Sequence, residues 1–76
     1  MTKNNEIDIK LGQQLRKLRE SRGLSADQLA ENLDISSVLL QRWEYGKKRI
    51  SAVMLFRLCE ALEVDVAEIF AGLAPT

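Results

Sequence analysis

Apolar residues recur along this chain at intervals of three and four, the spacing of an α-helix with one buried face. Leu11, Leu15 and Leu18 form the first such stripe. Helix-forming residues dominate, and the strict alternation of a half-buried strand is absent. The fold class predicted is therefore all-α. The predicted helices cover residues 9–22, 26–33, 37–45, 52–62 and 66–71.

Residues that start and stop helices support these boundaries. Gly23 and Gly46 follow the first and third predicted helices, where glycine easily takes the left-handed backbone that ends a helix. Gln28 and Glu68 each stand three residues after a cap, the spacing of a capping box. The predicted N-caps of the last four helices are Ser25, Ser36, Ser51 and Asp65.

The chain of 76 residues has room for one hydrophobic core. Residues 1–8 are polar and unpatterned, which predicts a flexible arm in which Asn5 or Asp8 can cap the first helix. Residues 9–73 form the predicted single domain. Residues 74–76 are a short C-terminal tail.

Several classes of protein are disfavoured. There is no histidine, no glycine-rich phosphate loop and no metal-ligand spacing, so we expect neither an enzyme nor a cofactor or metal. The single cysteine, Cys59, lies at core spacing and is expected to be a buried, inert thiol. Without a signal segment or an apolar run of roughly 18 residues, a soluble cytoplasmic protein with no membrane contact is expected.

Charge is balanced overall but segregated along the chain. Eleven basic residues match eleven acidic ones, so net charge gives no argument for nucleic acid. Residues 10–22 and 35–49 are nevertheless strongly basic, whereas 23–34 and the segment from Ile50 are acidic. One basic face can therefore coexist with an acidic one.

The second and third predicted helices are joined by about three residues, too few for a long antiparallel hairpin. A helix-turn-helix is the simple interpretation. Ala30 supports it, because a small residue lets the third helix cross closely over the second.

Four stretches resemble the phage-repressor family of the lambda repressor and Cro type. They are LRKLRESRGLS (15–25), QLAENLDIS (28–36), WEYGKKRIS (43–51) and CEALEVDVAEIF (59–70). The resemblance implies a compact five-helix bundle whose third helix enters the DNA major groove. It also implies that Leu40 and Trp43 are buried, and that Arg19 pairs with Glu44.

The resemblance assigns DNA contacts to particular positions. The implied base-reading residues are Ser37, Val38, Gln41 and Arg42. Arg42 can donate two hydrogen bonds to guanine, Gln41 can bond adenine, and Val38 offers a methyl surface to thymine. The expected phosphate contacts are Arg19, Ser36, Tyr45, Lys47, Lys48 and Arg49.

Some positions depart from the family pattern. Ala26 replaces a glutamine that commonly touches phosphate, and Asp34 and Glu63 stand where glycine is usual. Val38 and Leu39 are less polar than most residues of a reading helix. They fit a minor core, a protein contact or methyl readers about equally well.

Some apolar residues exceed what one small core needs. They are Val53, Phe56, Phe70 and Leu73. We expect these residues to form a homodimer interface, and the family resemblance favours the same surface. Two reading helices would then meet half-sites roughly 34 Å apart.

The sequence therefore predicts a sequence-specific double-stranded DNA-binding transcriptional regulator, a repressor that binds a pseudo-palindromic operator as a dimer. No sensor domain fits in the chain, so no small-molecule effector is expected. The main alternative is a protein-interaction module on the same fold, such as an antitoxin-like or adaptor protein. A third possibility is a protein that binds single-stranded nucleic acid or RNA. This possibility is weaker, because Tyr45 is the one candidate exposed aromatic residue on which a base could stack.

Overall fold

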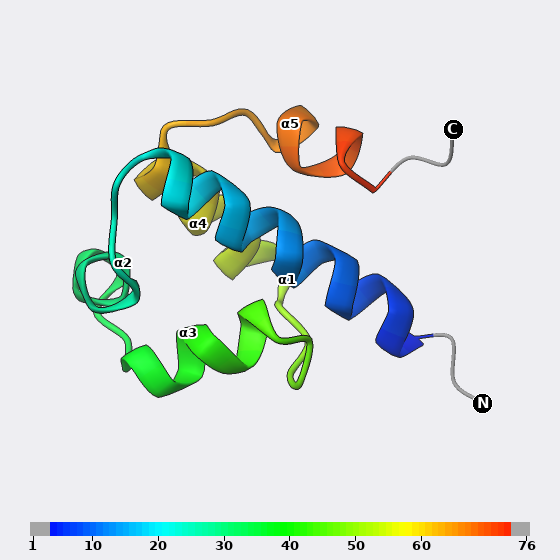
Figure 1. Cartoon of the computed structure of the whole chain (residues 1–76), viewed down its shortest axis with the longest axis horizontal. Coiled ribbons are helices and arrows are strands. Elements are labelled where there is room, and N and C mark those ends of the chain that lie inside the picture. Colours follow the sequence, from blue (N-terminus) through cyan, green and yellow to red (C-terminus); the bar gives the residue numbers. More distant parts are fainter. Residues whose placement is uncertain (1–3, 74–76) are drawn as a thin grey trace.

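A computed structural model describes residues 4–73 of the chain, with side chains from residue 6 onward. Within that range the secondary structure is entirely helical, which confirms the all-α prediction (Figure 1). The helices are α1 (Asn4–Ser21), α2 (Ala26–Leu33), α3 (Ser37–Glu44), α4 (Ala52–Leu62) and α5 (Val66–Ala71). None of these described helices is long and apolar enough to cross a membrane.

Helix α1 begins earlier than the sequence predicted. We expected a flexible arm over residues 1–8 and a helix from Ile9, but the helix starts at Asn4. Residues 4–8 contain no glycine or proline to interrupt it, and Glu6 in the first turn favours the positive end of the helix dipole. Asn5 and Asp8 are therefore inside the helix and not its caps. Residues 1–3 and the predicted tail, 74–76, lie outside the described range.

Helices α1 and α3 each end one residue earlier than predicted, at Ser21 and Glu44, and the other predicted boundaries agree with the structure. Tyr45 is the C-cap of α3, with φ −95° and ψ 6°, outside the helical range. The Ser25 and Gln28 capping box is complete: the Gln28 amide donates to Ser25 Oγ at 3.0 Å and the Ser25 amide to Gln28 Oε1 at 2.8 Å. At α5, the Asp65 amide donates to Glu68 Oε2 at 3.3 Å.

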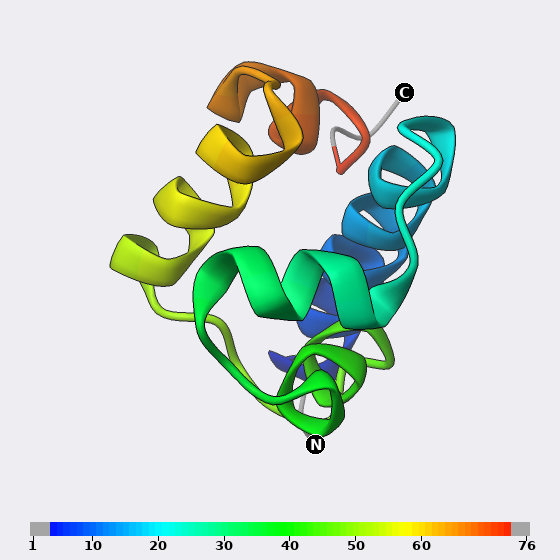
Figure 2. The same ribbon diagram turned by 90° about the vertical axis from the view of Figure 1, so that its left-hand side faces the viewer.

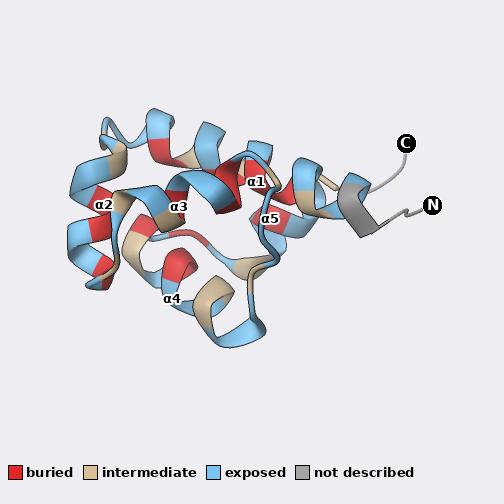
Figure 3. Ribbon diagram, turned by 90° about the horizontal axis from the view of Figure 1, so that it is seen from below, coloured by how far each residue is buried: buried red, intermediate tan, exposed pale blue. Residues whose placement is uncertain are grey.

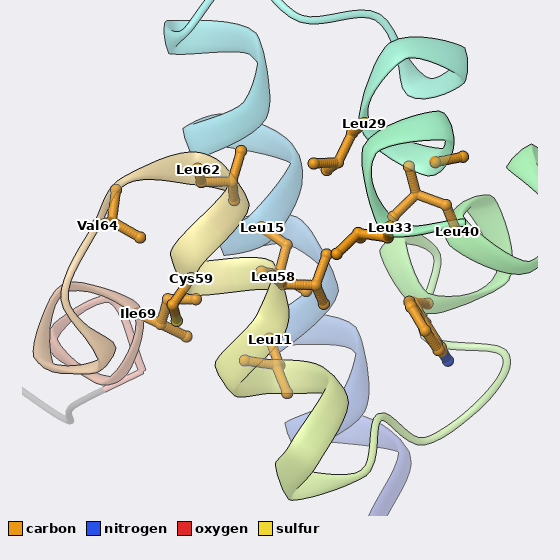
Figure 4. Packing of buried hydrophobic residues seen from close by; sticks show 12 residues of the cluster. Leu11, Leu15, Leu29, Leu33, Leu40, Leu58, Cys59, Leu62, Val64 and Ile69 are labelled. Carbon is orange, nitrogen blue, oxygen red and sulfur yellow. The ribbon is translucent and has the colours of Figure 1, made fainter. Parts of the chain in front are cut away.

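One hydrophobic core holds the helices together, and every helix contributes to it (Figure 4). Its buried members are Leu11, Leu15, Leu29, Ala30, Leu33, Leu40, Trp43, Leu58, Cys59, Leu62, Val64 and Ile69. Each fully buried leucine contributes roughly 1.5–3 kcal/mol of transfer free energy. The buried faces point inward while the outer surfaces of the helices are exposed (Figure 3).

Cys59 belongs to this core, as its spacing predicted. Burial raises the pKa of its thiol, and the nearby Asp65 and Glu68 carboxylates add to the shift. A raised pKa lowers the thiolate fraction at neutral pH, so the thiol is poorly nucleophilic.

Two arginines tie the ends of helices to their neighbours. Arg57 of α4 donates to the carbonyl of Leu33, the last residue of α2, at 3.2 Å. Arg22 donates to the carbonyl of Glu63, the residue that ends α4, at 2.9 Å. Such bonds satisfy carbonyls that have no partner within their own helix.

Candidate nucleic-acid interface

A tight turn joins α2 to α3, and Asp34 makes it possible. Its backbone is left-handed, with φ 59° and ψ 44°, and its amide donates to the Glu31 carbonyl at 3.1 Å. The next amide, Ile35, donates to the Ala30 carbonyl at 3.0 Å. Ala30 is buried, so its small side chain permits the crossing of α2 and α3 seen in Figure 2. The predicted helix-turn-helix is confirmed.

Helix α3 has one anchored face and one free face. Leu40 is completely buried and Trp43 is 4% exposed, as expected. Val38 is 60% exposed, and Gln41 and Arg42 are exposed beside it. Ser37, at the start of the helix, is half-buried.

Val38 and Leu39 are neighbours in sequence but differ in burial. Leu39 is half-buried and packs against the core, so it belongs to the edge of the interior. Val38 has no such packing and presents its methyl groups to solvent. Val38 is therefore the more available of the two to an external partner.

A buried ion pair fixes the end of α3 to α1. Arg19 Nε lies 2.7 Å from Glu44 Oε2, and Arg19 Nη2 donates to Glu44 Oε1 at 3.0 Å. A third guanidinium nitrogen, Nη1, donates to the Leu24 carbonyl at 2.8 Å. The hydrogen bonds with Glu44 raise the pKa of Arg19. The pair implied by the family resemblance is present.

This geometry also changes what Arg19 can do. The residue is only 9% exposed, and three of its nitrogens already have partners inside the protein. Bidentate, charge-assisted bonds of this kind fix both partners in orientation. Arg19 therefore serves mainly to hold α3 in position against α1.

The basic segment after α3, residues 47–49, is exposed. Arg49 Nε lies 3.4 Å from Asp8 Oδ1 of α1. Tyr45, 56% exposed, has the guanidinium of Arg16 over its ring, 5.7 Å from the ring centroid. That guanidinium also pairs with Glu20 at 3.2 Å.

Ser36, the remaining predicted phosphate contact, caps α3. Its hydroxyl oxygen accepts from the Leu39 amide at 3.1 Å, and the residue is exposed. The hydroxyl hydrogen is therefore free to point outward. The predicted phosphate residues other than Arg19 are exposed around the two ends of α3.

Gly12 and Gly46 position this surface because other backbone or side-chain atoms pack closely against them. A Cβ on Gly12 would fall on the backbone carbonyl oxygens of Trp43 and Glu44, so α1 and α3 meet there backbone against backbone. A Cβ on Gly46, where φ is +71°, would fall 2.5 Å from the Ile9 side chain. Gly12 could have been noticed as an isolated glycine within a helical pattern, which often marks a packing constraint.

The predicted dimer residues differ in exposure. Val53, Phe56 and Phe70 are 70%, 58% and 49% exposed, so they are free to meet another surface. Leu73 is half-buried and packs against the core of its own chain. Packing within its own chain therefore partly explains why Leu73 is apolar, without a dimer partner.

Comparison with known proteins bears directly on this arrangement. The model of the helix-turn-helix domain family matches residues 10–70. The uncharacterized HTH-type transcriptional regulator RP497 of Rickettsia prowazekii (strain Madrid E) is 40% identical over 68 residues, 90% of this chain and 52% of that protein. Control protein C.MunI of Mycoplasma sp is 31% identical over 70 residues, 91% of this chain and 95% of that protein.

The restriction-modification controller protein C.AhdI from Aeromonas hydrophila is similar in structure. The TM-score is 0.81 at 32% identity, with 86% of this chain and 98% of that chain covered. The chain spans about half the length of the first curated relatives that it matches. The chain belongs to the helix-turn-helix domain family, the DNA-binding fold of phage-repressor-like transcriptional regulators.

Proposed function

We propose that this protein is a sequence-specific regulator of transcription that inserts α3 into the major groove of double-stranded DNA. The observation that carries the proposal is the two-faced packing of α3. Its inner face is held by Leu40, Trp43 and Glu44, which are all buried, while the opposite face is exposed. A helix fixed in this way can offer the same side chains to a groove without first becoming ordered.

Base reading is assigned to the exposed face. Arg42 donates two hydrogen bonds to guanine O6 and N7, and Gln41 exchanges hydrogen bonds with adenine. Val38 contacts a thymine methyl group, and Ser37 supplies a hydroxyl at the start of the helix. Each good bidentate contact is worth roughly 1–3 kcal/mol of discrimination.

Phosphate contacts are assigned to the residues around both ends of α3: Arg19, Ser36, Tyr45, Lys47, Lys48 and Arg49. Lys47 and Lys48 are exposed and form no ion pair with any described residue. They contribute affinity that depends on salt and not on sequence. Arg19 contributes mainly by holding α3 in place, because its guanidinium is buried.

The active form is proposed to be a homodimer that represses by occupying its operator. Val53, Phe56 and Phe70 are large apolar side chains left exposed on α4 and α5. A twofold interface that covers them presents two copies of α3 to half-sites roughly 34 Å apart, hence a pseudo-palindromic site. The similarity to control protein C.MunI and controller protein C.AhdI supports a regulatory role.

Selection from a pool of random duplexes tests the DNA-binding proposal. We expect enrichment of a pseudo-palindromic sequence. Arg42→Ala should relax the preference at one base pair in each half-site, because it removes a base contact. Lys48→Ala should weaken binding to all duplexes similarly, because it removes a phosphate contact.

The rival function is a protein-interaction module on the same fold. It is favoured by the zero net charge and by the exposed Val38. If no duplex is enriched over background at modest salt, the DNA-binding proposal is wrong and the interaction module takes its place.

A further inference from the structure

The early start of α1 brings its first turns against the basic segment 47–49. Ile9 packs so closely on Gly46 that even a methyl group there would collide with it. Gly46 directly precedes the basic segment. The contact therefore fixes the neighbouring residue of α1, Asp8, beside that segment.

Asp8 uses this position to form an ion pair with Arg49. The distance from Asp8 Oδ1 to Arg49 Nε is 3.4 Å, with hydrogen-bond geometry. The side chain of Asp8 is 13% exposed, whereas that of Arg49 is 62% exposed. The carboxylate is thus fixed and sheltered from water, while the arginine remains accessible from outside.

We propose that Asp8 sets the strength of DNA binding by holding Arg49 in an ion pair that a phosphate must displace. The inference rests on the proposed function. The Asp8 carboxylate holds the Nε hydrogen of Arg49, so a phosphate that binds this edge of the guanidinium loses part of the energy of its contact in breaking the pair. The negative charge of Asp8 also repels the DNA phosphates directly.

The effect falls on affinity and not on sequence preference. Arg49 lies in the segment assigned to phosphates, which carry no sequence information. Asp8 therefore weakens binding to operator and unrelated duplexes alike. It also reduces the number of counterions released on binding, because one arginine is already neutralised.

The experiment compares Asp8→Asn with the parent on two duplexes, the selected sequence and an unrelated one, over a range of KCl concentrations. We expect about twofold to fivefold tighter binding to both duplexes, the range of an exposed ion pair. The plot of log affinity against log salt should steepen by about one unit. Circular dichroism of each variant confirms that it is folded.

Glu6→Gln is the matched control. Glu6 is also acidic, but it is exposed, stands two residues earlier on α1, about 200° around the helix, and forms no ion pair with a described residue. It measures the effect of losing one negative charge near DNA. A second arm repeats Asp8→Asn in the Arg49→Gln background, where its effect should fall to that of the control.

The outcomes are distinct. The inference is overturned if the parent binds DNA and Asp8→Asn binds no tighter than Glu6→Gln. It is also overturned if the gain persists in full without Arg49. Failure of the parent to bind any duplex would instead refute the proposed function, and this inference with it.

Discussion

Two residues adopt a backbone conformation that their side chains disfavour. Asp34 and Glu63 end α2 and α4 with φ of 59° and 58°, and each amide donates to carbonyls in the last turn of its helix. A left-handed conformation costs an ordinary residue roughly 1–2 kcal/mol, and aspartate tolerates it better than glutamate. The phage-repressor family that this chain resembles usually has glycine at these two positions.

Replacing Glu63 with glycine is therefore expected to stabilise the protein. Part of the relief is offset by the greater flexibility of glycine in the unfolded chain, so the net gain should be about 0.5–1 kcal/mol. Asp34→Gly should gain less. Urea unfolding, followed by the fluorescence of the single buried tryptophan, Trp43, measures both.

Glu60→Gly is the control for this pair of substitutions. Glu60 is exposed and lies within α4, where glycine costs roughly 1 kcal/mol. A gain at Glu60, or a loss at Glu63, would show that backbone strain is not what distinguishes these sites.

Gly12→Ala is predicted to be strongly destabilising although alanine is the better helix former. The added methyl group meets the backbone carbonyls of Trp43 and Glu44, which cannot move without shifting α3. We expect a loss of about 1–3 kcal/mol, as in other overpacked sites, measured by thermal unfolding. Gly72→Ala serves as comparison, since its methyl group meets the flexible side chain of Gln14. Equal losses at the two glycines would contradict this explanation.

The position of α3 matters most for the proposed DNA contact, and this helix is too short to be stable alone. It has eight residues, so its place depends on attachments to its neighbours. Leu40 and Trp43 attach it to the core, Gly12 sets its distance from α1, and the Arg19–Glu44 pair fixes its C-terminal end.

A double-mutant cycle on Arg19 and Glu44 tests this attachment. Removing one partner leaves a buried charge without compensation, which typically costs roughly 3–5 kcal/mol, so Arg19→Met and Glu44→Leu should each be severe. The double variant should lose much less than the sum of the two. Chemical unfolding of the four proteins provides the values, and simple additivity would mean that the pair is not coupled.

Two sets of exposed side chains stand out on the described part of the molecule. One is the free face of α3 with the basic segment 47–49, and the other is the large apolar residues Val53, Phe56 and Phe70 of α4 and α5. The proposed DNA contacts and the proposed dimer contacts therefore involve different residues. The charges divide in a similar way: residues 35–49 carry four basic residues and one acidic residue, whereas residues 50–76 carry one basic and four acidic residues.

Phe56→Glu is expected to shift the monomer–dimer balance towards monomer, because it places a charge in an apolar interface. Sedimentation equilibrium over a range of concentrations measures the shift. Gln13→Glu, which adds the same charge at an exposed position of α1, should leave the balance unchanged. A parent that is monomeric throughout, or a Phe56→Glu variant that dimerises normally, would contradict the proposed interface.

The sequence alone was enough to predict the helical class and the serine caps of α2, α3 and α4. These features depend on local spacing: apolar residues at intervals of three and four choose the buried face, and Ser25, Ser36 and Ser51 satisfy amides only a few residues away. The Arg19–Glu44 pair was available only through family resemblance, since its members stand 25 positions apart.

The tertiary structure decided what depends on contacts between distant segments. The start of α1 had no local signal strong enough to place it, and Asp8 and Ile9 meet the loop after α3 only once the helices have packed. The same packing partly buried Leu39, left Val38 exposed and turned Arg19 inward. Val38 and Leu39 are adjacent in sequence and similar in chemistry, yet they differ in exposure. Burial depends on how the helices pack and not on the residue type alone.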